Sequence, residues 1–293
     1  MATDVRSILV LIAVTAWHQV VQLSPYVIGG VLLAALLGQL DLRRWLSWSG
    51  RGNPSSIFGA ACVGGLSPLS TYGTVPVLLQ LLREGASPGP VLAFLVASSM
   101  LNPQLFFLVL GGLGTRLALA QLAAILVLSL IVGWMATRLP SSIFLQASAL
   151  SPSLVTPRRF TWSRLVGDAL RMIEWIGLTF VAGVILSAAI QVLIPAHWVT
   201  WLLGRGSWPG VLVAGVLGVP LYMCGGSAVP VLAGLAQMGM GPGVALAFLL
   251  TGPATRVTAL AAMSSLLNHR ALIAYIAYII LGAVIMGLFL GQV

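Results

Sequence analysis

Long stretches of this sequence carry no charged residue, and this feature restricts the chain to a membrane environment. No Asp, Glu, Lys or Arg occurs within residues 7–40, 206–255 or 271–293. A helix that crosses a bilayer needs about 20 consecutive apolar residues. Only 6% of the chain is charged and 59% is hydrophobic, whereas a soluble domain carries about 25% charged residues. The sequence therefore predicts an all-α polytopic membrane protein.

The positive charge of the chain is distributed as membrane topology requires. All 14 basic residues are Arg, and with 5 acidic residues they give a net charge of +9. They lie mainly in loops between apolar runs and form no single patch, which argues against nucleic-acid binding. Basic loops face the cytoplasm in membrane proteins, so we expect residues 41–53 and 139–163 there. The expected location is the cytoplasmic (inner) membrane of a prokaryote, crossed several times.

The apolar runs divide into continuous and interrupted stretches. Six runs are long enough for full spans, namely 10–39, 89–113, 117–137, 175–195, 243–266 and 271–291. Two further stretches, 54–84 and 209–239, are interrupted midway by Gly, Pro, Ser and Thr. If each interrupted stretch enters and leaves on one side, each half crosses three times, and the halves have opposite orientations. If each crosses fully, the chain has eight spans and parallel repeats. We favour inversion.

The two halves of the chain repeat the same motifs at an offset of 154 residues. The sequence Val-Pro-Val-Leu occurs at 75–78 and at 229–232, and Pro-Gly occurs at 88–89 and at 242–243. Shared Gly and Pro positions are rarer coincidences than shared Leu positions. We therefore divide the chain into a first repeat at 1–138, a cytoplasmic linker at 139–163 and a second repeat at 164–293. A pseudo-two-fold axis would relate the repeats, each with a broken or re-entrant helix.

Broken helices in paired repeats point to the substrate site of a transporter. Irregular backbone leaves unpaired N–H and C=O groups, which hydrocarbon tolerates only where protein or a watery cavity covers them. The two breaks should therefore form one central site near mid-membrane. The substrate-binding residues expected there are Ser70, Thr71, Tyr72, Gly73, Cys224, Gly225, Gly226 and Ser227. The alternative is that small residues at the breaks only allow helices to pack closely.

Two polar residues outside these breaks are further candidates for substrate binding. Asn102 precedes Pro103 in the middle of the run 89–113, where we expect a kink with the amide facing the cavity. Arg256 is the one charge between residues 206 and 269, and a charge within a span is by default a functional candidate. It would pair with an anion or act in gating, unless it reaches the interface from a helix end.

At these motifs the sequence resembles the ArsP-like permeases, whose best-known members export trivalent organoarsenicals. The matching motifs are Pro-Leu-Ser-Thr-Tyr-Gly-Thr-Val-Pro at 68–76, Gly-Val-Pro-Leu-Tyr-Met-Cys at 218–224 and Gly-Pro-Ala-Thr at 252–255. The family places two cysteines in the first motif, where this chain has Ser70 and Tyr72. Cys224 remains in the second motif, and Arg256 replaces the usual Asn. Trivalent arsenicals prefer thiolates, so these replacements bear on the substrate.

The resemblance and the residues together predict a permease that moves a small solute, with efflux of a trivalent organoarsenical or another metalloid as the implied activity. The alternative is a small-anion transporter or a channel with the same central site. No catalytic dyad, nucleotide motif or cluster of metal ligands is evident in the sequence, so we expect neither an enzyme nor a cofactor or bound metal. The expected partners are a small-molecule or anionic substrate and membrane lipid. Assembly into a homo-oligomer is left open.

Overall fold

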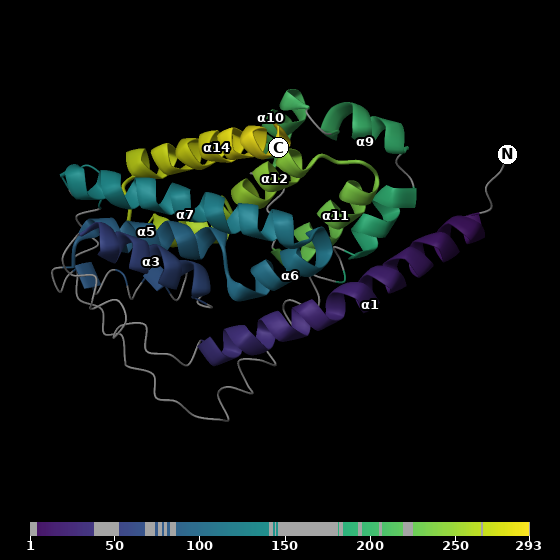
Figure 1. Cartoon of the computed structure of the whole chain (residues 1–293), viewed down its shortest axis with the longest axis horizontal. Coiled ribbons are helices and arrows are strands. Elements are labelled where there is room, and N and C mark those ends of the chain that lie inside the picture. Colours follow the sequence, from purple (N-terminus) through teal and green to yellow (C-terminus); the bar gives the residue numbers. More distant parts are fainter. Residues whose placement is uncertain are drawn as a thin grey trace.

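The structure is a computed structural model in which almost every regular element is a helix (Figure 1). It describes residues 5–37, 53–67, 74–75, 78, 81–82, 86–140, 143, 145, 181, 184–192, 195–204, 207–218, 225–264 and 266–292. In these ranges the only bridge between extended residues joins Leu145 to Leu267. The prediction of an all-helical fold is confirmed for this part of the chain.

Eleven helices have defined bounds within the described ranges. They are α1 (Val5–Leu37), α3 (Pro54–Leu66), α5 (Pro88–Met100), α6 (Pro103–Leu113), α7 (Thr115–Arg138), α9 (Ala196–Leu203), α10 (Trp208–Leu217), α11 (Gly225–Gln237), α12 (Pro242–Ala254), α13 (Val257–Met263) and α14 (His269–Gln292). Proline occupies the first turn of α3, α5, α6, α10 and α12. There it has a preset φ angle and lacks only an N–H that would have no partner inside the helix.

Two helices, α7 and α14, are each long and apolar enough to cross a membrane. Two bent pairs, α5 with α6 and 184–192 with 197–203, would raise the number of described spans to four. The outward surface of α14 carries large exposed apolar side chains, including Ile273, Leu281 and Phe289. Soluble monomers rarely expose such continuous apolar patches, which mark contact with a membrane or a partner.

Helices α3, α5 and α7 pack into a three-helix group through small residues. A Cβ at Gly133 of α7 would lie 2.9 Å from the Ala93 Cβ and 3.1 Å from the Gly89 carbonyl oxygen on α5. A Cβ at Gly89 would in turn lie 2.7 Å from the Gly133 carbonyl oxygen, with Thr137 also in contact. These pairings run in opposite order along the two helices, so α5 and α7 are antiparallel.

Helices α10, α12 and α14 form a second group with the same kind of contact. A Cβ at Gly287 of α14 would lie 2.6 Å from the Gly243 carbonyl oxygen of α12. A Cβ at Gly243 would collide with the Gly287 carbonyl oxygen. Glycine is required at both positions because the two backbones touch, as in close helix packing within membranes.

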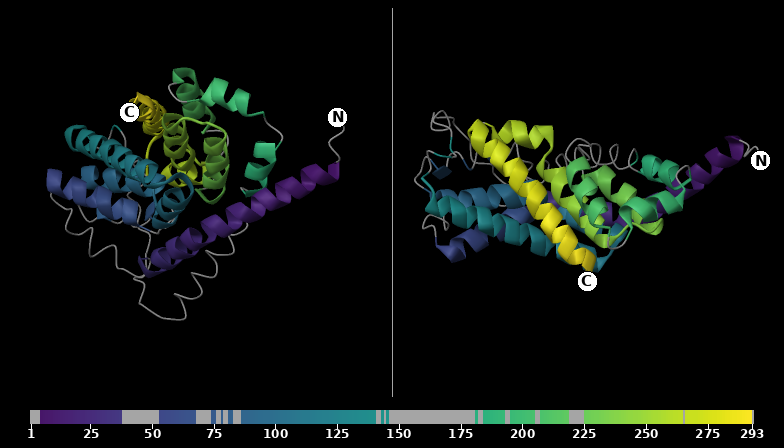
Figure 2. Two further views of the ribbon diagram at one scale, coloured as in Figure 1. Left: turned by 45° about the vertical axis from the view of Figure 1, so that its right-hand side comes forward. Right: turned by 90° about the horizontal axis from the view of Figure 1, so that it is seen from above.

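The two groups meet where α7 crosses α14 (Figure 2). A Cβ at Gly282 would strike the Leu128 side chain, and the Tyr278 hydroxyl donates to the Leu128 carbonyl oxygen at 2.7 Å. The chain just beyond the end of α7 lies beside the start of α14, since Asn268 Nδ2 donates to the Ile143 carbonyl oxygen at 2.6 Å. Helices α7 and α14 are therefore antiparallel.

The structure refines the predicted spans. The interrupted stretches are confirmed in that α3 ends at Leu66 and α10 ends at Leu217. The kink expected at Asn102 is also confirmed, because α5 and α6 meet at 44°. The run 243–266 is not one continuous helix, since α12 ends at Ala254 and α13 begins at Val257.

Candidate functional site

The two expected breaks fall largely outside the described residues. Ser70, Thr71, Tyr72, Gly73 and Cys224 are among those that the structure does not describe. Gly225, Gly226 and Ser227 form the first turn of α11, where only the backbone is described. Among the ten candidate residues, only Asn102 and Arg256 have described side chains, so these two define the geometry of the site.

Asn102 stabilises the break between α5 and α6. Its Oδ1 accepts a hydrogen bond from the Leu105 N–H at 2.7 Å, and Pro103 follows it as the first residue of α6. This is the N-cap arrangement, in which a side chain satisfies one of the free N–H groups of a helix start. In α5, Ser98 and Ser99 are buried and donate to the carbonyl oxygens of Leu95 and Val96.

Arg256 occupies the matching break between α12 and α13. The Thr255 N–H and hydroxyl both donate to the Thr251 carbonyl oxygen, the hydroxyl at 2.7 Å. Side-chain bonds of this type compete with the helical pattern and bend helices. Arg256 is half-buried, and its Nε donates to the Pro253 carbonyl oxygen at 3.2 Å. A partly buried Arg at a helix end is suited to hold an anionic or strongly polar group.

Tyr275 of α14 joins the two breaks. Its hydroxyl lies 3.0 Å from the Ser99 Oγ at the end of α5 and 3.4 Å from the Ala254 carbonyl oxygen at the end of α12. Helices α5 and α12 come from different halves of the chain and contact each other directly. The structure thus brings Asn102 and Arg256 into one region, each next to a helix end that Tyr275 touches.

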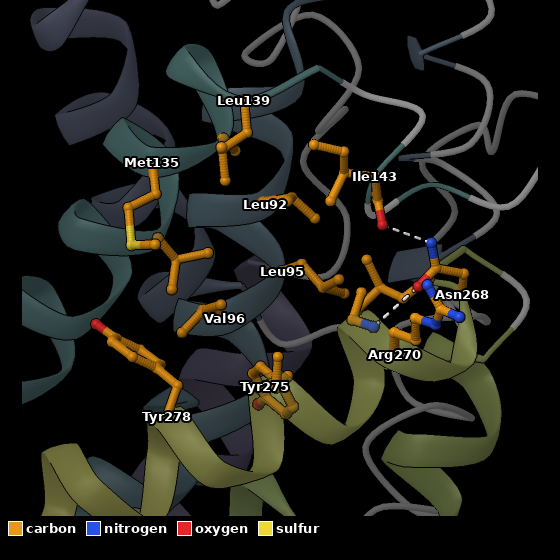
Figure 3. A pocket seen from close by; sticks show the side chains of 15 residues that line it. Leu92, Leu95, Val96, Met135, Leu139, Ile143, Asn268, Arg270, Tyr275 and Tyr278 are labelled. Carbon is orange, nitrogen blue, oxygen red and sulfur yellow. Dashed lines mark hydrogen bonds between the residues drawn. The ribbon is translucent and has the colours of Figure 1, made fainter.

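An apolar cavity of about 570 Å³ lies between α5, α7 and α14 (Figure 3). Leu92, Leu95, Val96, Val132, Met135, Ala136, Leu139, Ile143, Leu267, Asn268, Arg270, Ala271, Ala274, Tyr275 and Tyr278 line it. Tyr275 connects this cavity to the two breaks, because its ring lines the cavity and its hydroxyl contacts their helix ends. The cavity is large enough for a small molecule with apolar groups.

The polar end of the cavity lies where α14 begins. Arg270 is exposed there, and Asn268 bonds both to the Ile143 carbonyl oxygen and, through its Oδ1, to the Ala271 N–H at 2.9 Å (Figure 3). Asn268 therefore caps α14 and also holds the chain that follows α7 against it. The cavity leads from this charged rim to Tyr275.

A second buried polar group lies beside α11. The Ser187 hydroxyl donates to the Pro230 carbonyl oxygen at 2.8 Å, while Gln19 Nε2 and Gln191 Nε2 donate to the Ser187 Oγ at 2.9 and 3.2 Å. Ser187 is completely buried. This group ties α1 and residues 184–192 to the helix that begins with Gly225. The helix that follows the second expected break, α11, thus makes a buried polar contact through its Pro230 carbonyl oxygen.

Sequence reasoning missed Tyr275 and Ser99, which form one of the hydrogen bonds between the halves. Both lie in runs without charge, where hydroxyl groups give a weak signal. The available signal was the offset of 154 residues at which Tyr275 follows Gln121, since each is a polar residue within an apolar run. In the described part of the chain, no three His, Cys, Asp or Glu residues gather where they could hold a metal ion.

Comparisons with known proteins identify relatives along the chain. The ArsP_1 family model, described as a predicted permease, matches residues 4–292. UPF0718 protein MJ0584 of Methanocaldococcus jannaschii is 27% identical over 111 residues, which cover 38% of this chain and 30% of that protein. UPF0718 protein YraQ of Escherichia coli K12 is 38% identical over 88 residues, which cover 30% of this chain and 25% of that protein. The chain thus matches less than a third of the length of each. No solved structure matches it.

Proposed function

This chain belongs to the family of predicted permeases whose motifs it resembles, and we propose that it moves a small solute across a prokaryotic cytoplasmic membrane at the junction of its two halves. The observation that carries this proposal is the Tyr275 hydroxyl, which touches the ends of both α5 and α12. Broken helices that meet between two halves are where transporters bind their substrates.

We further propose that the halves are repeats, and the helix bounds support this. Helices α5 and α12 begin 154 residues apart and end 154 residues apart, and so do α7 and α14. Asn102 and Arg256 are separated by the same interval and occupy the same place after α5 and α12.

The close glycine contacts also recur at the same interval. Gly89 meets Gly133 in the first half, and Gly243 meets Gly287 in the second, with each member displaced by 154 residues. Helix packing through backbone contact depends on glycine at specific positions. Chance similarity between apolar sequences would not reproduce which two glycines touch, so this recurrence supports a structural repeat.

The direction of α7 and α14 favours inverted repeats over parallel ones. Repeats related by an axis along the membrane normal would run these equivalent helices in the same direction, whereas they are antiparallel. Leu128 and Gly282, which touch, are themselves 154 residues apart. Under two-fold symmetry, a residue can touch its own symmetry equivalent only where the axis passes between the two. With α7 and α14 crossing the bilayer, that axis lies in the membrane plane.

The apolar cavity gives the solute a route to the junction. Its rim at Arg270 lies on the same side as the end of α7 at Arg138, because the two helices are antiparallel. The positive-inside rule puts this side in the cytoplasm. We infer that the cavity faces the cytoplasm and that a solute reaches Tyr275 from there, which is the direction that efflux requires.

For the substrate, we propose a small metalloid compound with apolar groups, such as a trivalent organoarsenical. The family resemblance and the apolar lining of the cavity support this class, and Cys224 would supply a thiol. A small anion is the second candidate, because Arg256 is half-buried beside the junction. An anion would gain from that charge, whereas a neutral arsenical would depend on the thiol.

Flux measurements on vesicles that contain the purified chain test these proposals. We expect saturable flux of a trivalent methylated arsenical, strong loss of flux in Cys224→Ser and little change in the matched control Cys62→Ser. If Arg256→Gln abolishes sulfate or phosphate flux while Cys224→Ser leaves it intact, the anion candidate replaces the arsenical. The absence of flux for all these solutes would refute both substrate classes.

The same vesicles separate a carrier from a channel. A carrier changes conformation once per cycle, so its flux saturates with solute concentration, and a coupled carrier also responds to its ion. A channel with broken helices at its constriction would conduct without saturation in the same range. Unsaturated flux that Tyr275→Phe alters only in selectivity would favour the channel.

A further inference from the structure

Gln121 of α7 is completely buried, and neither its Nε2 nor its Oε1 has a hydrogen-bond partner among the described residues. An amide side chain offers two N–H donors and a carbonyl acceptor. Burying such a group without partners is costly. By contrast, the buried hydroxyls of Ser99 and Thr251 bond to carbonyl oxygens of their own helices. Within the described ranges, Gln121 is thus a buried side chain whose amide nitrogen and oxygen both lack a partner.

The register of α5 and α7 places Gln121 beside the break between α5 and α6. These antiparallel helices touch at Gly89 and Gly133, and each rises 1.5 Å per residue. Twelve steps along each helix from that contact bring Gln121 level with Leu101, the residue that follows α5. Gln121 lies about 120° around α7 from Gly133, and α7 packs on both α5 and α12.

The same count in the second half serves as a check. From the contact between Gly243 and Gly287, twelve steps bring Tyr275 level with Thr255. The hydrogen bond between the Tyr275 hydroxyl and the carbonyl oxygen of Ala254, one residue earlier, agrees with this register. Gln121 and Tyr275 therefore occupy equivalent positions. Gln121 lies beside the break between α5 and α6, and Tyr275 lies beside the break between α12 and α13. Tyr275 spans from its own half to Ser99 of the other half, whereas Gln121 has no described counterpart to Ser99.

We propose that the Gln121 amide binds a neutral group that both donates and accepts a hydrogen bond. This group would lie where the break between α5 and α6 meets the break between α12 and α13. A bare anion accepts only and would leave Oε1 unpaired, while a metal cation would leave the N–H groups unpaired. A hydroxyl satisfies both kinds of atom. It would come from a bound water molecule or from a hydroxyl-bearing solute, and only the second source rests on the proposed function.

Cysteine labelling tests whether Gln121 faces a polar, accessible space. In a chain freed of thiols by Cys62→Ser and Cys224→Ser, Gln121→Cys is compared with Ala124→Cys, a buried position one turn away on α7. The probe is a small water-soluble methanethiosulfonate, and Tyr275→Cys in the cavity lining serves as the positive control. We expect Gln121→Cys to react at least about tenfold faster than Ala124→Cys. Equal, slow reaction at both positions would overturn a solute as the source of the hydroxyl.

A structure of the unmodified protein provides a second measurement if the cysteine variant does not fold. At a resolution that reveals ordered water, we expect a non-protein peak within hydrogen-bond distance of Gln121 Nε2 or Oε1. Protein groups bonded to both atoms would refute the proposal.

Flux through Gln121→Leu then identifies the source of the hydroxyl. If the peak is present and the folded variant loses flux, the solute is the guest; if flux is unchanged, the guest is water. Absence of flux in the unmodified protein would count against the proposed function alone, because the labelling result and the peak do not depend on transport.

Discussion

The backbone contact between α12 and α14 predicts a specific response to Gly287→Ala. The added Cβ would lie 2.6 Å from the Gly243 carbonyl oxygen, 2.9 Å from the Val211 Cγ1 and 3.1 Å from the Ala247 Cβ. The first of these neighbours is backbone and cannot rotate away, so the helices must separate. Overpacking of this kind costs about 1–3 kcal/mol, and the higher helix propensity of Ala returns about 1 kcal/mol. We expect a net loss of stability of up to about 2 kcal/mol.

Gly59→Ala in α3 is the matched control, because a Cβ at Gly59 would have no atom within 4 Å. It should gain up to about 1 kcal/mol from helix propensity alone. Thermal unfolding of both variants in the same detergent gives the comparison, with Gly287→Ala expected to melt several degrees below Gly59→Ala. Gly133→Ala tests the repeat, since its Cβ would lie 3.1 Å from the Gly89 carbonyl oxygen. If Gly287→Ala melts as high as Gly59→Ala, the two backbones do not touch.

Three further predictions concern the junction. Tyr275→Phe should lower stability by about 1 kcal/mol through the lost hydroxyl bonds and reduce flux by a larger factor; wild-type flux would argue against a role in transport. Asn102→Ala should cost about 1 kcal/mol because it removes the cap of α6, whereas Asn102→Ser, which keeps a capping oxygen, should cost less. In a chain without native thiols, Leu128→Cys with Gly282→Cys should be joined by a short bifunctional thiol reagent, while the outward-facing Leu119→Cys with Gly282→Cys should not; the reverse result would contradict the crossing of α7 and α14.

Much of the fold follows from charge-free runs and their interruptions. The helices α7 and α14 match the predicted spans 117–137 and 271–291 closely, because each is an uninterrupted apolar run with Arg beside an end. The family resemblance is confirmed over nearly the whole chain. The division of 243–266 into two helices was not predicted, because the run is apolar on both sides of Arg256.

The site was predictable only in part, for a physical reason. Arg256 and Asn102 were identified because a charge and an Asn-Pro pair are conspicuous in an apolar run. Tyr275 and Ser99 were not identified, because a hydroxyl in an apolar run can bond either to its own helix or to a distant helix. The sequence does not distinguish the two cases. Their contact depends on how α14 lies across α5, which the spacing of residues along the chain does not reveal. The breaks at Ser70–Gly73 and Cys224–Ser227 stay predictions as a substrate site.

On the proposed inverted repeat, the contact between Leu128 and Gly282 has a consequence for the symmetry of the two halves. In a homodimer of identical half-length chains inserted in opposite orientations, a residue on the symmetry axis must face its own copy. Two leucines there would collide, and two glycines would leave a gap. A leucine facing a glycine requires two halves with different sequences. On the proposed inverted repeat, a single chain can place Leu128 opposite Gly282 because its two halves differ in sequence, which two identical subunits cannot do.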